Sequence, residues 1–133
     1  EPLFEENNNL WKSYDSTIGG RTLVKNRNKV NFSILNIDEI GKRLIISWGT
    51  SFDACYNIIV KNSFYPLGLV NCLNYGHPED SMGAFKQFVE DLTKKCRENK
   101  VPIVGGNVSL YNATNNISIN PTPILVMVGI DKL

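Results

Sequence analysis

Hydrophobic and polar residues alternate along the first part of the chain with the period of a half-buried β-strand. Between residues 30 and 36, for example, Val30, Phe32 and Ile34 are separated by polar neighbours. Comparable β-rich stretches are separated by turns that contain Gly, Asn or acidic residues. The pattern predicts strands at 21–24, 30–36, 43–48 and 66–72.

Two stretches have the apolar spacing of a helix. Residues 52–62 place Phe52, Cys55 and Ile59 on one side, although β-branched residues weaken this signal. Residues 81–99 form a clearer amphipathic pattern, with one apolar stripe made of Met82, Phe85, Phe88, Val89, Leu92 and Cys96. Asp80 or Ser81 is expected to cap this helix, and Trp48, Phe85 and Phe88 are expected in the core.

The last part of the chain returns to short strands. Residues 101–104 lead directly into a Gly-Gly pair, and 117–120 and 124–130 flank a Pro-Thr-Pro segment. The stretch from 66 to 104 therefore reads as a strand–helix–strand crossover. The predicted fold class is α+β.

Length and composition favour one soluble domain. A chain of 133 residues, 42% hydrophobic and 20% charged, is the size and composition of one globular domain. The polar tract Glu5–Asn9 predicts that 1–16 is a linker from an upstream region and that 17–133 is the folded domain.

The longest apolar run, 124–130, is too short to span a bilayer. A net charge of +1 without a basic face argues against nucleic acid as a partner.

The three cysteines, Cys55, Cys72 and Cys96, are widely spaced and show no C-x-x-C pair. This usage favours reduced thiols and a cytoplasmic location. Four matches to the N-glycosylation pattern, at 31, 107, 112 and 116, leave a secreted glycoprotein as a distant alternative.

The segment from Val104 to Ser109 carries the candidate chemistry. Gly105 and Gly106 at a strand end could turn the backbone so that successive N–H groups face an anion. Asn107 offers an amide oxygen to a hard cation such as Mg²⁺, and Ser109 offers a hydroxyl to phosphate or substrate. We expect a phosphate and metal cradle here.

Three segments together resemble one family. They are Leu73-Asn74-Tyr75-Gly76-His77-Pro78-Glu79, then Pro102-Ile103-Val104-Gly105-Gly106-Asn107-Val108-Ser109-Leu110-Tyr111-Asn112, then Pro121-Thr122-Pro123. Their order and spacing resemble the second synthetase half of phosphoribosylformylglycinamidine synthases, also called formylglycinamide ribonucleotide amidotransferases. The run from Tyr14 to Thr22 is similar to the family's entry to this half.

The resemblance implies a domain like the N-terminal half of aminoimidazole ribonucleotide synthetase. Such a domain has a mixed sheet with helices on one face and pairs with a second domain into an eight-stranded barrel. The implied reaction is the ATP-dependent conversion of formylglycinamide ribonucleotide to the amidine in purine biosynthesis, by a glutamine-using carbon–nitrogen ligase. The implied partners are the other synthetase half and a glutaminase. The isolated domain is expected to be inactive and to self-associate as a homodimer.

By position, the resemblance implies that Gly106 and Asn71 contact ATP, Asn107 ligates Mg²⁺ and Ser109 contacts the ribonucleotide. No catalytic residue is assigned in this chain, and His77 is interpreted as a turn residue. Asn71 stands where the family has Asp, and a neutral amide attracts Mg²⁺ less than a carboxylate does. A diverged, non-catalytic structural domain that binds nucleotide weakly or not at all is therefore the alternative.

Overall fold

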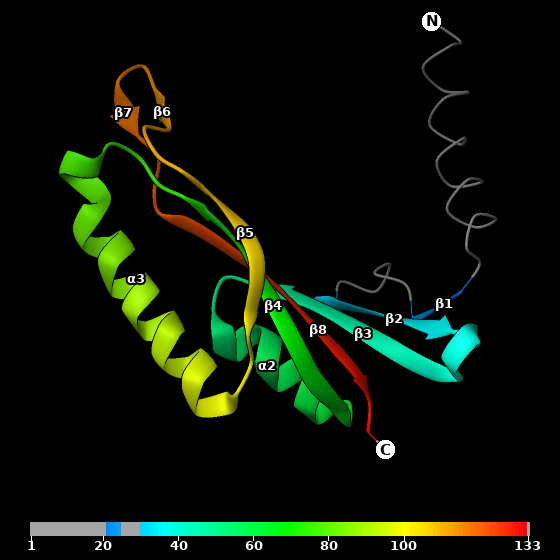
Figure 1. Cartoon of the computed structure of the whole chain (residues 1–133). Coiled ribbons are helices and arrows are strands. Elements are labelled where there is room, and N and C mark those ends of the chain that lie inside the picture. Colours follow the sequence, from blue (N-terminus) through cyan, green and yellow to red (C-terminus); the bar gives the residue numbers. More distant parts are fainter. Residues whose placement is uncertain (1–20, 25–29, 133) are drawn as a thin grey trace, which may run out of the picture.

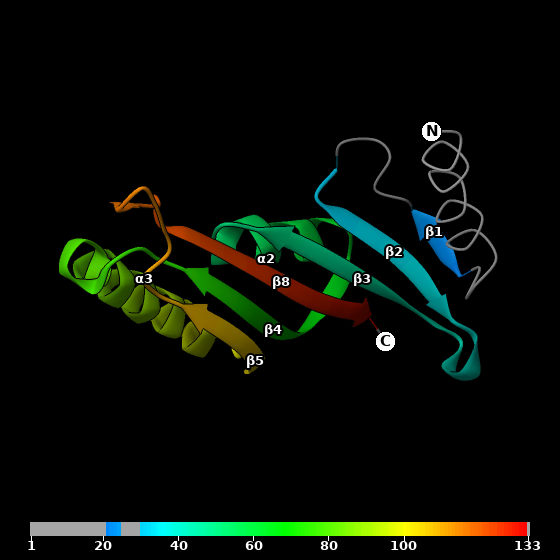
Figure 2. The same ribbon diagram turned by 90° about the horizontal axis from the view of Figure 1, so that it is seen from above.

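The computed structural model describes residues 21–24 and 30–132. The linker predicted at 1–16, and residues 14–20 of the entry segment, lie outside the described residues. The described chain is a six-stranded sheet with two helices, plus a small two-stranded hairpin (Figures 1 and 2). The predicted α+β class with a mixed sheet is confirmed.

The sheet has the strand order β1-β2-β3-β8-β4-β5. All neighbouring strands are antiparallel except β4 and β5, which are parallel. The last strand of the chain is therefore inserted between β3 and β4. The bounds are β1 Thr22–Val24, β2 Phe32–Ile37, β3 Lys42–Gly49, β4 Phe64–Asn74, β5 Ile103–Ser109 and β8 Thr122–Asp131.

Helix α2, Phe52–Lys61, connects β3 to β4, and helix α3, Pro78–Asn99, connects β4 to β5. Ser51 caps α2, because its side chain accepts a hydrogen bond from the Ala54 N–H at 3.2 Å. The N-cap of α3 is His77, not Asp80 or Ser81 as expected from the sequence. The helix starts earlier because Pro78 at its first position needs no N–H partner there.

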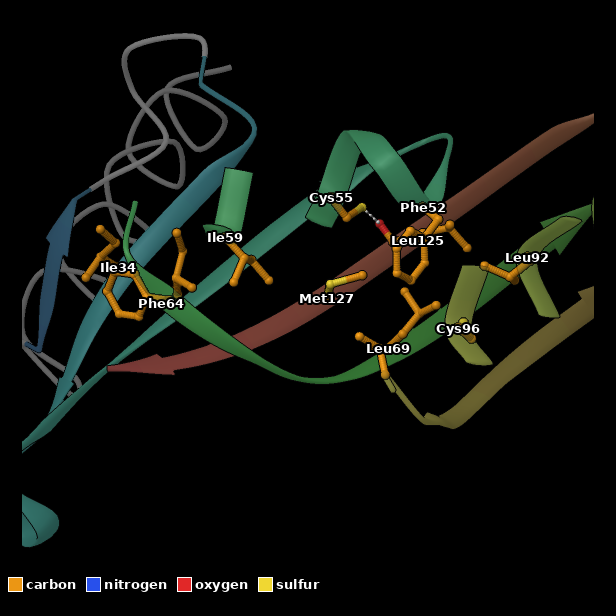
Figure 3. Packing of buried hydrophobic residues seen from close by; sticks show 12 residues of the cluster. Ile34, Phe52, Cys55, Ile59, Phe64, Leu69, Leu92, Cys96, Leu125 and Met127 are labelled. Carbon is orange, nitrogen blue, oxygen red and sulfur yellow. Dashed lines mark hydrogen bonds between the residues drawn. The ribbon is translucent and has the colours of Figure 1, made fainter. Parts of the chain in front are cut away.

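The core lies between the sheet and the two helices (Figure 3). Ile45, Leu69, Leu125 and Met127 point from the three central strands toward this layer and are fully buried. The helices contribute Phe52, Cys55, Ile59, Leu92 and Cys96. Gly129 lets α2 approach closely, since a Cβ there would lie 2.7 Å from a methyl carbon of Ile59. Helices on one face of the sheet are thus observed as expected.

The opposite face of the same strands, which we call the open face, is also apolar. Alternation and register place Leu44, Ile46, Trp48, Val70, Ile124, Val126, Val128 and Ile130 on it. None of these side chains is fully buried. Trp48 lies here, half-buried, and not in the core as expected. The error arose because both faces of these strands are apolar, so composition could not tell one from the other.

The segment between β5 and β8 holds the hairpin of β6, Ala113–Thr114, and β7, Ile117–Ser118. It lies beside the N-terminal end of α3 (Figure 1). The Ser118 hydroxyl accepts from the His77 N–H at 3.0 Å and donates to Asp80 at 2.8 Å. These bonds attach the hairpin to the end of β4 and the start of α3. A short 3₁₀ turn, η2, Asp38–Ile40, connects β2 to β3.

Candidate functional site

The parallel pair β4 and β5 brings the predicted site residues next to each other. In its register, Asn71 is opposite Gly106, Cys72 is opposite Asn107 and Asn74 is opposite Ser109. Helix α3 makes the crossover, so both strands end at the same edge of the sheet. Carboxyl ends of parallel strands are where α/β proteins commonly bind ligands. The crossover predicted from 66 to 104 therefore positions this candidate site.

The Gly-Gly pair does not form the expected turn. Gly105 and Gly106 lie inside β5, paired with Val70 and Asn71, and Gly106 has a φ of +159°, which residues other than glycine rarely adopt. An anion cradle made of successive turn N–H groups is therefore wrong for this segment. Glycine is also needed at 106 for its lack of a side chain, because a Cβ there would collide with the side-chain oxygen of Asn71 and lie 2.5 Å from its carbonyl oxygen. A Cβ at Gly105 would meet nothing closer than 3.8 Å.

The sheet separates two of the predicted residues. Asn71 alternates with the buried residues Leu69 and Leu73, so its side chain is on the helix-covered side. Asn107 is in register with Cys72 on the open face, and its side chain is exposed. One cradle containing both amides is therefore not observed. Asn71 contacts Gly106, whereas Asn107 shares a face with Ser109.

Ser109 lies in a hydrogen-bond network that the sequence analysis missed. Its hydroxyl donates to the Asn74 side-chain oxygen at 2.9 Å and accepts from the Asn112 amide at 2.8 Å. The Asn74 amide in turn donates to the Thr122 carbonyl at 3.1 Å, and the Asn112 amide donates to the Tyr75 carbonyl at 2.9 Å. Asn74 and Asn112 were visible in the sequence as part of the family-like segments, but their spacing of 38 positions hid the contact.

His77 occupies the junction of β4 and α3. Its ring packs edge-on against Tyr111, with 5.6 Å between centroids, and its carbonyl accepts from the Ser81 hydroxyl at 2.9 Å. These are the contacts of a residue that shapes a turn. They agree with the interpretation of His77 as a turn residue.

The buried cysteines are poor nucleophile candidates. Burial raises the pKa of Cys55 to about 11, and burial also raises the pKa of Cys96. Reactive thiols need the opposite shift. Cys72 is half-buried on the open face, where the Asn74 amide lies 3.6 Å from its sulfur.

The donor set suits one part of a divalent-cation site. Over residues 21–24 and 30–132, no three His, Cys, Asp or Glu side chains come together in a possible metal cluster. What the open face offers is the exposed amide oxygen of Asn107, two residues from Ser109. A hard cation held by carboxylates and phosphates can use such an oxygen as one ligand. A cation at this place would therefore need charged ligands from outside the described residues.

Neither helix in the described part of the chain is long and apolar enough to cross a membrane.

A known protein family matches most of the chain. The model of the AIR synthase related protein, N-terminal domain, matches residues 26–130. The chain belongs to this family. The AIR synthase family match includes both helices and every described strand from β2 to β8, although it stops one residue short of the end of β8.

Curated relatives of this chain belong to the enzyme family that its sequence motifs resemble. The subunit PurL of phosphoribosylformylglycinamidine synthase from Nitratiruptor is 34% identical over 139 residues, which is 92% of this chain and 19% of that protein. The chain thus spans about a fifth of the length of the curated relatives it matches. The resemblance to phosphoribosylformylglycinamidine synthases is confirmed.

Solved structures show the same fold. The structure of PurLQS from Thermotoga maritima gives a TM-score of 0.71 at 24% identity, covering 90% of this chain and 23% of that chain. Thermotoga maritima PurL complexed with ATP gives 0.66 at 23% identity, covering 85% and 22%. The same protein complexed with FGAR gives 0.68 at 23% identity, covering 92% and 22%.

Proposed function

We propose that this chain is the AIR-synthase-type domain of the second synthetase half of a phosphoribosylformylglycinamidine synthase. The whole protein would convert formylglycinamide ribonucleotide to the amidine, with ATP activating the amide oxygen and glutamine-derived ammonia displacing phosphate. The observation that carries the proposal is the PurL match over 92% of the chain, which includes the parallel pair that holds the family-like segments.

We propose roles for four residues, although the sheet separates Asn71 from Asn107. Gly106 and Asn71 contact ATP, Asn107 supplies one oxygen to Mg²⁺, and Ser109 contacts the ribonucleotide. The Thermotoga maritima complexes with ATP and FGAR support these ligand classes. When bound, the metal would neutralise charge on the transferred phosphate. We propose that this chain's residues position the ligands, and that the charged metal ligands and the catalytic groups lie in the other parts of the protein.

The open face supports the proposed pairing into an eight-stranded barrel. The open face contains a hollow of about 210 Å³, which is lined by Gly68, Val70, Val104, Val126 and Val128, among others. An apolar sheet face of this kind needs a cover. We propose the other synthetase half as that cover in the whole protein, and a second copy of the chain when it is alone. A glutaminase is a further proposed partner, in line with the PurLQS assembly.

Domain limits and location also remain proposals. We propose 17–133 as the domain and 1–16 as a linker; the family match begins at residue 26, inside this range. The free thiols Cys55, Cys72 and Cys96 suit a cytoplasmic protein.

Calorimetric titration of the full-length protein with ATP and Mg²⁺ tests the proposal. Magnesium-dependent ATP binding, and amidine formation from glutamine or ammonia, are expected for the full-length protein. The isolated chain should form no product. Asn71→Asp should strengthen magnesium-dependent binding only if the nucleotide and its cation reach the helix-covered side, where Asn71 lies, and Asn57→Ala on the exposed side of α2 is the control. Absence of ATP binding and of product in the full-length protein would refute the proposal.

A structural, non-catalytic domain is the second candidate. Asn71 favours it, because this side chain is neutral and lies across the sheet from Asn107. In that case the domain would still complete the barrel, but nucleotide would change the thermal stability of neither the natural protein nor Asn71→Asp. The same titration series therefore separates the two candidates.

A further inference from the structure

The amide of Asn74 has a fixed orientation. Its nitrogen lies 3.1 Å from the carbonyl oxygen of Thr122 and 3.3 Å from that of Cys72. A carbonyl oxygen can only accept, so the N–H groups of Asn74 must point toward these two atoms. Its side-chain oxygen is consequently turned toward Ser109, 2.9 Å away.

The amide of Asn112 is fixed in the same way. Its nitrogen lies 2.9 Å from the Tyr75 carbonyl oxygen, which can only accept. The same nitrogen lies 2.8 Å from the Ser109 oxygen. Both N–H groups of Asn112 are therefore used, one by the carbonyl of Tyr75, directly after β4, and one by the hydroxyl oxygen of Ser109.

These two amides determine what Ser109 can still offer. A serine hydroxyl has one proton to donate and two lone pairs that accept. The proton goes to Asn74, because that oxygen accepts only, and one lone pair receives the Asn112 N–H. A single lone pair remains. A phosphoryl oxygen has no proton to give to that lone pair, whereas an amide N–H or a sugar hydroxyl has one.

We infer that Ser109 acts as a hydrogen-bond acceptor that selects an N–H or O–H group of the substrate, and does not bind a phosphate. Asn74 and Asn112 are the positioning residues that impose this polarity. The inference rests on the proposed function, because it assumes that the ribonucleotide lies on the open face beside Ser109. The sequence left open whether the Ser109 hydroxyl binds a phosphate or another part of the substrate. The inference excludes the phosphate.

A ligand pair that differs only in the phosphate tests the polarity. The full-length protein is titrated with formylglycinamide ribonucleotide and with the corresponding ribonucleoside, as the natural protein and as Ser109→Ala. Because Ser109→Ala removes one neutral hydrogen bond, the affinities for the two ligands should fall by a similar factor, about 2- to 12-fold. A roughly 10- to 150-fold loss for the nucleotide with none for the nucleoside would show a bond to charged phosphate and overturn the inference. No loss for either ligand would also overturn it.

The positioning role has its own readout. Asn112→Ala should weaken ribonucleotide binding while ATP affinity stays unchanged, and Ser109→Ala should then add less than it does in the natural protein. Fully additive effects would exclude coupling between the two side chains. Asn57→Ala, an exposed asparagine on α2, is the matched control and should change neither affinity.

A structure of the full-length protein with the ribonucleotide tests the polarity without any variant. The ligand atom within hydrogen-bond distance of the Ser109 oxygen should carry a proton, and a phosphoryl oxygen at that place would overturn the inference. If the natural protein binds neither the nucleotide nor the nucleoside, the proposed function falls and this inference with it. If both ligands bind but Ser109→Ala weakens binding of the nucleotide alone, the inference falls and the proposed function stands.

Discussion

The two faces of the sheet are built from the same strands yet have different fates. On the helix-covered face, Ile45, Leu69 and Met127 are completely buried by α2 and α3. On the open face, one residue along the same strands, Val70 and Ile124 remain 38% and 42% exposed. A sheet that is apolar on both faces is typical of one that is covered on both. The difference in burial supports the proposal that a second cover packs on the open face.

The open face is not uniform either. Its centre is apolar, but the carboxyl ends of β4 and β5 carry Asn107 and the network of Asn74, Ser109 and Asn112. Polar groups at the end of an apolar face are well placed to meet a ligand at the rim of whatever covers that face. The proposed barrel and the proposed ligand site are therefore neighbouring parts of one surface.

Truncating the helix-covered face should have the largest effect. Leu69→Ala removes a completely buried side chain beside Met127 and should lower the free energy of unfolding by about 2–5 kcal/mol. Val70→Ala, the next residue on the open face, should cost much less in the isolated chain because Val70 is already exposed. Urea denaturation of both variants measures the difference. Equal losses would contradict the separation of the two faces.

The Gly-Gly pair offers a finer comparison across the same strand. Gly106→Ala should cost about 1–3 kcal/mol, because the new methyl group collides with Asn71 and alanine rarely adopts a φ of +159°. Gly105→Ala is the matched control and should be nearly neutral, since its Cβ would meet only ordinary contacts. Chemical denaturation again measures both. Equal costs for the two variants would refute the close approach of Asn71 as the reason for glycine at 106.

Charge on the open face tests whether it is an interface. Val70→Lys should weaken self-association of the isolated chain at least tenfold, about 1.4 kcal/mol, because a lysine would be buried without a partner. Val60→Lys on α2 is the control, with a similar exposure of 40% against 38% for Val70. Sedimentation over a range of concentrations measures the dimer. A natural chain that stays monomeric throughout would contradict self-association through this face.

The smallest effect is expected at the C-terminal end of the sheet. The Arg43 guanidinium donates to Asp131 at 2.7 Å, and this bond, with the Arg43 backbone N–H, lowers the pKa of Asp131 below its ordinary value. Because the folded pKa is the lower one, the stabilisation is present above the unfolded pKa and is lost as pH falls through the folded pKa.

Asp131→Asn should therefore flatten the acid end of the stability profile and leave the rest of it nearly unchanged. Thermal melting between acid and neutral pH measures the profile. Glu90→Gln, which removes an exposed helix pair with Lys86, is the control and should change it less. An unchanged acid limb in Asp131→Asn would show that the Arg43 pair does not contribute.

Local pattern predicted the elements well where one period dominated. The apolar stripe through Phe88, Leu92 and Cys96 gave α3, and the alternation around Phe32 and Ile34 gave β2. The predicted start of α3 was wrong, since its N-terminal end depends on Pro78 and on the hairpin that contacts His77. Met82, assigned to the apolar stripe, is 41% exposed because it lies near that end, beyond the reach of the core.

The sequence by itself determined the family, through the run from Val104 to Asn112, and the order of the two helices and the six strands of the main sheet, because both depend on local residue types. Only the tertiary structure decided which face each site residue takes. It placed Asn71 and Asn107 on opposite sides of the sheet, turned the Gly-Gly segment into an edge strand, and joined Asn74 to Asn112 through Ser109. The physical reason is that register and strand order are set by long-range pairing, with β8 inserted between β3 and β4, and a shift of one residue moves a side chain to the other face.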